Sequence, residues 1–105
     1  MNGLTPQTLE AIRQEALRGI AKHGTERSAL SLTLSNGAKL AILGEEFGEV
    51  CNVLTYDSGH GPEELYKELI QVANVAACWA QALDERVLSL KRKALESSDV
   101  VTFQT

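Results

Sequence analysis

Apolar residues recur at helical spacing in three segments of the chain. The first segment runs from Thr5 to Gly24, and its apolar face is formed by Leu9, Ile12, Ala16 and Ile20. Threonine caps helix N-termini well, proline is tolerated in the first turn, and glycine suits the left-handed residue that follows many helices. The pattern therefore predicts a helix over residues 6–23.

Residues 25–36 interrupt this periodicity by alternating leucines with small polar residues, which fits either an extended crossing or an irregular helical turn. Ser35 or Asn36 can then cap a second helix. Its apolar seam, spaced by three and four residues, consists of Leu40, Leu43, Phe47, Val50 and Leu54. This spacing is typical of a helix that packs on another helix.

A polar break at residues 57–61 is followed by Pro62, which can start a long third helix. Its seam runs through Leu65, Leu69, Val72, Ala76, Trp79 and Leu83, with a continuation through Val87, Leu90 and Ala94. Few strongly polar residues lie between Leu69 and Leu83, so we expect this stretch to be buried on most sides.

Small residues mark one face of each of the last two helices: Ala41, Gly44 and Gly48 on the second, and Ala73, Ala77 and Ala80 on the third. Glycine inside a helix costs about 0.5 to 1 kcal/mol relative to alanine. We expect close packing of the two helices to explain these glycines, the less favoured alternative being a ligand that approaches the backbone. Cys51 and Cys78 show no metal-ligand spacing and are interpreted as small buried hydrophobic residues.

The short connection at residues 57–61 predicts an antiparallel pair, and thus an all-α antiparallel helical bundle. A chain of 105 residues forms one domain at most, expected over residues 1–95, with residues 96–105 as a C-terminal tail without helical period. One small chain cannot cover every apolar stripe, so we expect self-association to complete the bundle.

The formal net charge of -4 argues against binding of a nucleic-acid polymer, which requires a concentrated basic surface. The sequence has no apolar run of membrane-spanning length and no signal-peptide pattern. We therefore expect a soluble cytoplasmic protein without a membrane partner.

Acidic residues inside the apolar helices are the candidate chemical feature. Glu45, Glu46 and Glu49 fall within an arc of about 100 degrees on the second helix. Such crowding is easiest to explain if a hard divalent cation offsets the repulsion, although acidic pairs also decorate many exposed helices. Glu68 lies in the most apolar helix, where a carboxylate is costly to bury unpaired. The alternative for Glu68 is a salt bridge or an exposed position.

These acids lie in two motifs, EEFGE at residues 45–49 and ELIQ at residues 68–71. Their order and separation resemble the EExxE and ExxD motifs of the MazG-like nucleoside triphosphate pyrophosphohydrolases. The resemblance extends to AKHG before the first motif and LIQVANVAACWAQAL in and after the second, so it covers about residues 10–83.

The resemblance implies a MazG-like helical bundle that assembles as a dimer or tetramer and converts a (d)NTP to a (d)NMP and pyrophosphate with Mg2+, for which Mn2+ can substitute. Such an enzyme could clean the nucleotide pool. Carried onto this chain, Glu46, Glu49 and Glu68 bind the metal, and Glu45 either binds it or positions the attacking water. The two candidate catalytic residues are Glu45 and Glu49.

The chain departs from the family motif at Gln71, which stands where the family has aspartate. Its amide offers the metal a carbonyl oxygen but no charge, so we expect weaker Mg2+ binding. Asn74 either supplies a further oxygen, contacts the base or sugar, or bonds to a helix partner.

Four residues are candidates for substrate binding: Lys67, Asn74, Lys91 and Arg92. For the basic residues near the end of the third helix, the alternative is solvation and interaction with the helix dipole. Two other functions compete with hydrolysis, namely a nucleotide-binding or regulatory homologue with weak chemistry and a structural oligomerisation module.

Overall fold

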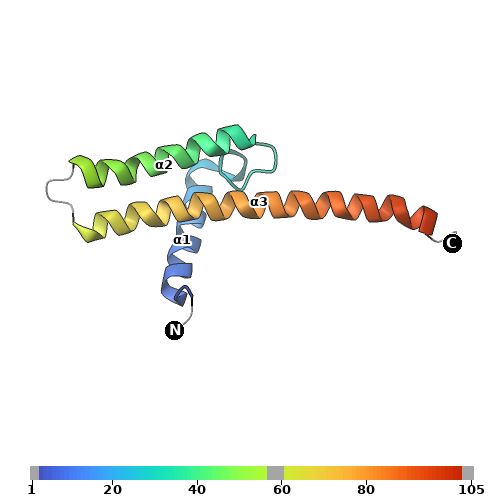
Figure 1. Ribbon diagram of the computed structural model, residues 1–105, viewed down its shortest axis with the longest axis horizontal. Coiled ribbons are helices and arrows are strands. Elements are labelled where there is room, and N and C mark those ends of the chain that lie inside the picture. Colours follow the sequence, from blue (N-terminus) through green and yellow to red (C-terminus); the bar gives the residue numbers. More distant parts are fainter. Residues whose placement is uncertain (1–2, 57–60, 103–105) are drawn as a thin grey trace.

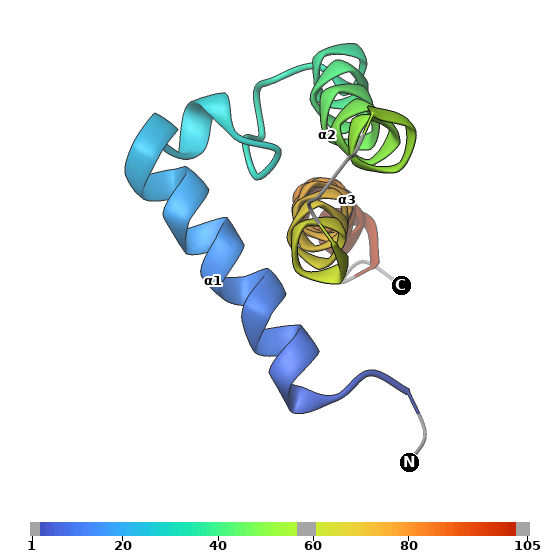
Figure 2. The same cartoon turned by 90° about the vertical axis from the view of Figure 1, so that its left-hand side faces the viewer.

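Three α-helices form the described part of the chain in the computed structural model, which comprises residues 3–56 and 61–102. They are α1 (Pro6–His23), α2 (Asn36–Tyr56) and α3 (Pro62–Thr102), and a 3-10 turn at Thr25–Arg27 follows α1. The helices α2 and α3 lie side by side in antiparallel directions, and α1 crosses α3 steeply (Figures 1 and 2). The expected all-α class is confirmed. The expected break at residues 57–61 lies, except for Gly61, outside the described residues.

The helix ends follow local capping chemistry. Thr5 Oγ1 accepts the Thr8 N–H at 3.1 Å, and Gly24 at φ 82° donates its N–H to the Ile20 carbonyl at 2.8 Å. These bonds confirm the predicted span of residues 6–23. At α2, Ser35 is the cap, because its Oγ accepts the Ala38 N–H at 3.1 Å.

The segment between α1 and α2 is an irregular turn held by buried polar groups. The Ser31 side chain, 2% exposed, accepts the Leu34 N–H at 2.9 Å. Lys39, 3% exposed, donates from Nζ to the Ser31 carbonyl oxygen. The Lys39 stem therefore fills the space under this turn while its ammonium satisfies a backbone acceptor.

Replacing Lys39 tests this role. We expect Lys39→Ala to lower the free energy of unfolding by about 2 to 3 kcal/mol, because it leaves a cavity and an unpaired carbonyl. Urea denaturation followed by circular dichroism measures the change. Lys91→Ala, at an exposed position, is the control and should change little. If the two variants unfold alike, Lys39 does not support the turn.

The core lies where α1 crosses the pair formed by α2 and α3. Its buried centre consists of Ala29, Val75 and Cys78. The partly buried residues packed on it are Ala16, Leu30, Ile42, Leu43 and Trp79. Trp79 also donates from Nε1 to Asn36 Oδ1 at 2.9 Å, which ties the start of α2 to the middle of α3.

Both predicted apolar seams are displaced from the faces that the helices bury. On α2, Val50 is buried as expected, but Leu40 and Phe47 are 59% and 60% exposed. On α3 the buried residues are Glu68, Val75, Cys78 and Ala82, whereas Leu69 and Leu83 are 49% and 41% exposed. The expectation that residues 69–83 are buried on most sides is therefore wrong for the single chain. The physical reason is that each helix also bears apolar side chains on an outer face.

The small-residue faces do not pack on one another. A Cβ atom built on Gly44 or Gly48 would meet no atom within 4 Å, and Ala77 and Ala80 are exposed. The predicted close approach of the two backbones is thus wrong within one chain. Cys78 is buried as expected, whereas Cys51 is exposed because it lies on the outer face of α2.

The helix α3 continues well beyond the start of α2 (Figure 1). Every residue from Leu83 to Ser97 is exposed. The helix also continues to Thr102 through most of the segment expected to be a tail, and residues 103–105 lie outside the described part. Among the described helices, none has a stretch long and apolar enough to cross a membrane.

Candidate functional site

Two glutamates and one glutamine meet between α2 and α3. In the orientation that satisfies its neighbours, the Gln71 amide nitrogen donates to Glu46 Oε2 at 2.8 Å and to Glu68 Oε2 at 2.9 Å. The amide therefore bridges a carboxylate of α2 and a carboxylate of α3. The antiparallel pairing of these helices brings together residues that are 22 positions apart in the sequence.

Burial makes this pair of carboxylates costly to ionise. Glu68 is 7% exposed and Glu46 is half-buried. Burial raises the pKa of both groups, and the charge of Glu68 raises the pKa of Glu46 further. The hydrogen bonds from Gln71 offset part of this cost because they favour the charged forms. The site thus favours a proton or a cation between its two acids.

The other motif glutamates, Glu45 and Glu49, are exposed beside this pair. The charge of Glu49 contributes to the raised pKa of Glu68, and the charge of Glu45 contributes to that of Glu46. Within the described residues, no three acidic, histidine or cysteine side chains form a group close enough to hold a metal ion. The carboxylate pair with Gln71 is therefore the compact part of the site.

This donor set fits Mg2+, a hard cation that prefers oxygen ligands. In proteins Mg2+ is commonly held by one or two carboxylates and completes its shell with water and substrate phosphates. Glu46 and Glu68 supply the two carboxylates, and the Gln71 amide can present its oxygen after rotation. Burial and neighbouring carboxylates raise the pKa of both glutamates, and a cation held by the pair would offset that cost.

A further acid, Glu15 of α1, belongs to the same surroundings. Its side chain is only 15% exposed and contacts Arg18 one turn later. Its charge raises the pKa of both Glu46 and Glu68. Sequence reasoning missed this residue because no motif includes it, and only the crossing of α1 over the helix pair brings it near.

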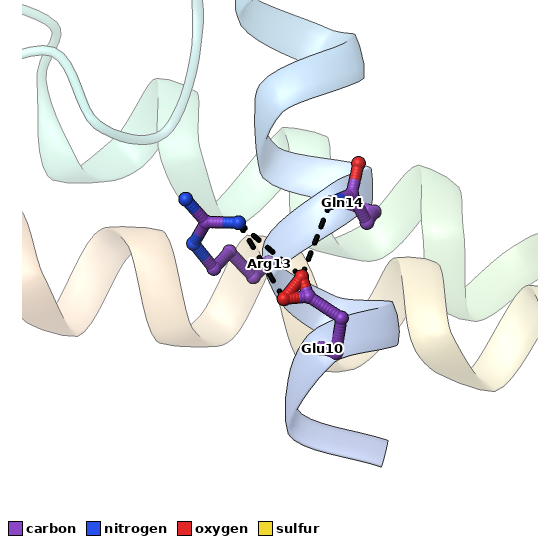
Figure 3. Close-up of polar contacts among 3 residues, drawn as sticks. All are labelled: Glu10, Arg13 and Gln14. Atoms are coloured by element: carbon purple, nitrogen blue, oxygen red, sulfur yellow. Dashed lines mark hydrogen bonds and ion pairs between the residues drawn. The ribbon is translucent and has the colours of Figure 1, made fainter. Parts of the chain in front are cut away.

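Glu10, one turn before Glu15, shows the contrast with a solvated acid. It accepts from Gln14 Nε2 at 3.1 Å and pairs with Arg13 at 3.2 Å on the exposed face of α1 (Figure 3). The hydrogen bond from Gln14, assisted by Arg13, lowers its pKa. Two acids on one helix thus face different surroundings, and only Glu15 faces the site.

A cavity of about 440 Å³ opens beside the carboxylate pair, between α1, the following turn and the helix pair. Acidic residues on its wall are Glu15, Glu45 and Glu46. Residues that can donate from nitrogen also line it, namely Arg18, Lys22, His23, Arg27, Gln71 and Asn74. An anionic ligand bearing a divalent cation would therefore meet carboxylates at the cation and basic groups at its anionic part.

The residues predicted to bind substrate are spread over the molecule. Asn74 lines the cavity, and its Oδ1 accepts from Cys78 Sγ at 3.2 Å, which is the helix-partner bond considered from the sequence. Lys67 is exposed beside Glu68, where its charge opposes the rise of that pKa. Lys91 and Arg92 lie on the exposed extension of α3 and do not line the cavity. The basic residues that line the cavity come instead from α1 and the following turn.

Comparisons of the chain with protein-family models, with curated proteins and with solved structures found no match. The resemblance to the MazG-like family therefore stays a prediction from the EEFGE and ELIQ motifs. The convergence of Glu46, Glu68 and Gln71 is independent of that resemblance, because it follows from the arrangement of α2 and α3.

The buried carboxylate of Glu68 gives a prediction about stability. With EDTA present, we expect Glu68→Gln to raise the melting temperature by a few degrees at neutral pH, because it removes a buried charge and keeps an oxygen that can accept from Gln71. A glutamate with a raised pKa is least costly when protonated. The gain should therefore be small below the ordinary pKa of 4.5 and grow as pH rises through the folded-state pKa.

Differential scanning calorimetry between about pH 4 and pH 7.5 measures this dependence. The matched control is Glu96→Gln, an exposed acid on the same helix, which should leave the melting temperature nearly unchanged across the range. A Glu68→Gln protein less stable than the parent at pH 7.5 in EDTA would show that the charge is well accommodated without a cation.

Proposed function

We propose that the protein is a Mg2+-dependent nucleoside triphosphate pyrophosphohydrolase that releases pyrophosphate and a nucleoside monophosphate. The observation that carries the proposal is the pair Glu46 and Glu68 bridged by Gln71. Of these three residues, Glu46 and Gln71 line a cavity that also has basic residues on its wall. The cation of a metal-bound triphosphate would meet the carboxylates of the site, and the phosphates would meet the basic residues of the cavity wall. The motif resemblance adds the reaction type.

The chain's own residues would divide the work as follows. Glu46 and Glu68 hold the cation, with the Gln71 amide turned to offer its oxygen. Bound Mg2+ supplies charge neutralisation and polarises the phosphoryl oxygens. Arg18, Lys22 and Arg27 neutralise the triphosphate, since they line the same cavity.

The exposed acids Glu45 and Glu49 are the candidates for accepting a proton from the attacking water. A base at this place matters because water is a weak nucleophile when neutral. Asn74, on the cavity wall, is placed to hydrogen-bond the base or sugar. The breaking bond joins the α-phosphorus to the bridging oxygen, and pyrophosphate leaves with that oxygen.

The direct test is a pyrophosphate-release assay with the purified full chain. Canonical and modified NTPs and dNTPs are each incubated with Mg2+, with Mn2+ and with EDTA. We expect release with at least one nucleotide class that depends on the metal and stops with EDTA. Release of inorganic phosphate alone, or no turnover with any nucleotide, would contradict the proposal.

One observation favours a second candidate, a nucleotide-binding or regulatory protein with weak chemistry. The Gln71 amide nitrogen donates to both carboxylates and so partly satisfies them without a cation. A site whose carboxylates already accept hydrogen bonds from Gln71 can still bind a nucleotide through Arg18, Lys22 and Arg27. Calorimetric titration with a nonhydrolysable triphosphate and the pyrophosphate-release assay together separate the candidates. Both proteins bind the analogue, but only the enzyme releases pyrophosphate from hydrolysable nucleotides.

A further inference from the structure

The outer face of α3 carries a continuous heptad repeat of exposed or half-buried residues. One set of positions, seven apart, is Tyr66, Ala73, Ala80, Val87 and Ala94, and the interleaved set is Leu69, Ala76, Leu83, Leu90 and Ser97. All of these side chains are exposed except that of Ala73, which is half-buried. A spacing of alternating three and four residues over four heptads is the pattern of a coiled-coil seam.

The seam changes in side-chain size along its length. Between residues 73 and 80 its three members are all alanine, whereas between residues 83 and 90 they are Leu83, Val87 and Leu90. A parallel, in-register pair would place alanine against alanine in three successive layers and large residues against their own copies. Such an interior would be empty in one half and crowded in the other.

An antiparallel pair centred between residues 81 and 82 avoids this mismatch. In that register Ala73 meets Leu90 of the second copy, Ala76 meets Val87, and Ala80 meets Leu83. Leu69 meets Ala94 in the same way. Every layer then combines one large and one small side chain, which gives the even packing that protein interiors require.

Charge along α3 disfavours a parallel pair, because like basic charges would then lie beside one another. Residues 63–68 carry Glu63, Glu64 and Glu68 against Lys67, a net charge of -2. Residues 84–93 carry Asp84 and Glu85 against Arg86, Lys91, Arg92 and Lys93, a net charge of +2. In this antiparallel register the basic residues 84–93 lie beside the uncharged residues 70–79 of the second copy, whereas a parallel pair sets Arg86 beside Lys91 of the second copy. Residues 63–68 face acidic residues in both directions, because residues 95–100 carry Glu96 and Asp99.

We propose that the chain forms a homodimer through an antiparallel coiled coil of two α3 helices, in which the extension at residues 83–97 of each copy covers the alanine-rich half of the other. The extension has no cover within its own chain. The second copy therefore supplies the surface that the single chain lacks. The proposal stands apart from the proposed function, because the heptad face includes none of the residues of the carboxylate site.

Cysteine cross-linking tests the register in the full chain with Cys51→Ser and Cys78→Ala as the background. We expect the double variant Ala73→Cys with Leu90→Cys to form a covalent dimer on mild oxidation. Neither single variant should do so, because identical positions this far from the centre lie about 25 Å apart along an antiparallel pair at a rise of 1.5 Å per residue. Dimers from the Leu90→Cys variant alone would show a parallel pair and overturn the proposal.

Light scattering coupled to gel filtration tests the surface itself. The parent should show about twice the chain mass of 11.4 kDa at micromolar concentration. The double variant Leu83→Glu with Val87→Glu should run as a monomer and keep the near-ultraviolet circular dichroism of Trp79, which packs against the core. The matched control is Leu88→Glu with Leu95→Glu, two exposed leucines off the seam, which should stay dimeric. A monomeric parent, or a control as disrupted as the seam variant, would refute the proposed interface.

Discussion

Pyrophosphate release with Mg2+ should fall roughly 100-fold in both Glu46→Gln and Glu68→Gln, if the pair holds the catalytic cation. Each variant removes one of the two carboxylates that Gln71 bridges, while it keeps the size of the side chain. The loss corresponds to part of the several kcal/mol that a bound metal contributes to stabilising charge in the transition state. Initial rates at saturating nucleotide, measured across Mg2+ concentrations, give the effect.

Two features make this experiment specific. Glu68→Gln should gain stability in EDTA while it loses activity, so the loss cannot come from unfolding. Glu10→Gln serves as the control, because Glu10 belongs to an exposed pair on α1 away from the carboxylate site. Wild-type rates in both site variants would exclude the carboxylate pair as the metal site.

Replacing Gln71 with aspartate should tighten Mg2+ binding by about tenfold. The change adds a third carboxylate beside Glu46 and Glu68, which the Gln71 amide already contacts. Without metal the same change should lower stability. Glu46 and Glu68 would lose their donor and gain a like charge in buried surroundings. The Gln71→Asp protein is therefore expected to melt below the parent in EDTA and to gain more from added Mg2+.

Thermal unfolding during a Mg2+ titration of both proteins follows these opposite effects. Gln81→Asp, an exposed glutamine on the same helix, is the control and should titrate like the parent. A Gln71→Asp protein that is less stable at every Mg2+ concentration, with no gain in affinity, would assign Gln71 a structural role and restrict the metal ligands to the glutamates.

The helix ends were predictable because their causes are local. Thr5, Gly24 and Ser35 act on backbone groups within four residues, so the sequence alone indicates where α1 and α2 begin or end. The buried faces were less predictable. Leu40 and Leu69 satisfy a helical period as well as Val50 and Val75 do, and periodicity does not say which of two apolar faces a single chain covers.

The same distinction between local and non-local causes applies to the candidate site. The sequence predicts a shared metal site of Glu45, Glu46, Glu49, Glu68 and Gln71. Hydrogen bonds from Gln71 join Glu46 and Glu68 in the structure, and Glu45 and Glu49 are exposed beside them. Glu15 and Arg18 were not predicted, since their place depends on how α1 crosses the pair, which no local signal specifies. Lys39 carried no sign of burial, because its partner is a backbone carbonyl eight residues earlier.

In the proposed dimer, the extension of α3 would also couple folding to protein concentration. A helix of this length that packs on nothing is marginal in water, so residues 83–97 of a lone chain should open and exchange their amide hydrogens quickly. Association in the proposed dimer would protect these amides by mass action. Dilution should therefore shorten the helix from its free end before the three-helix core is affected. The helical content of the chain should then rise and fall with protein concentration.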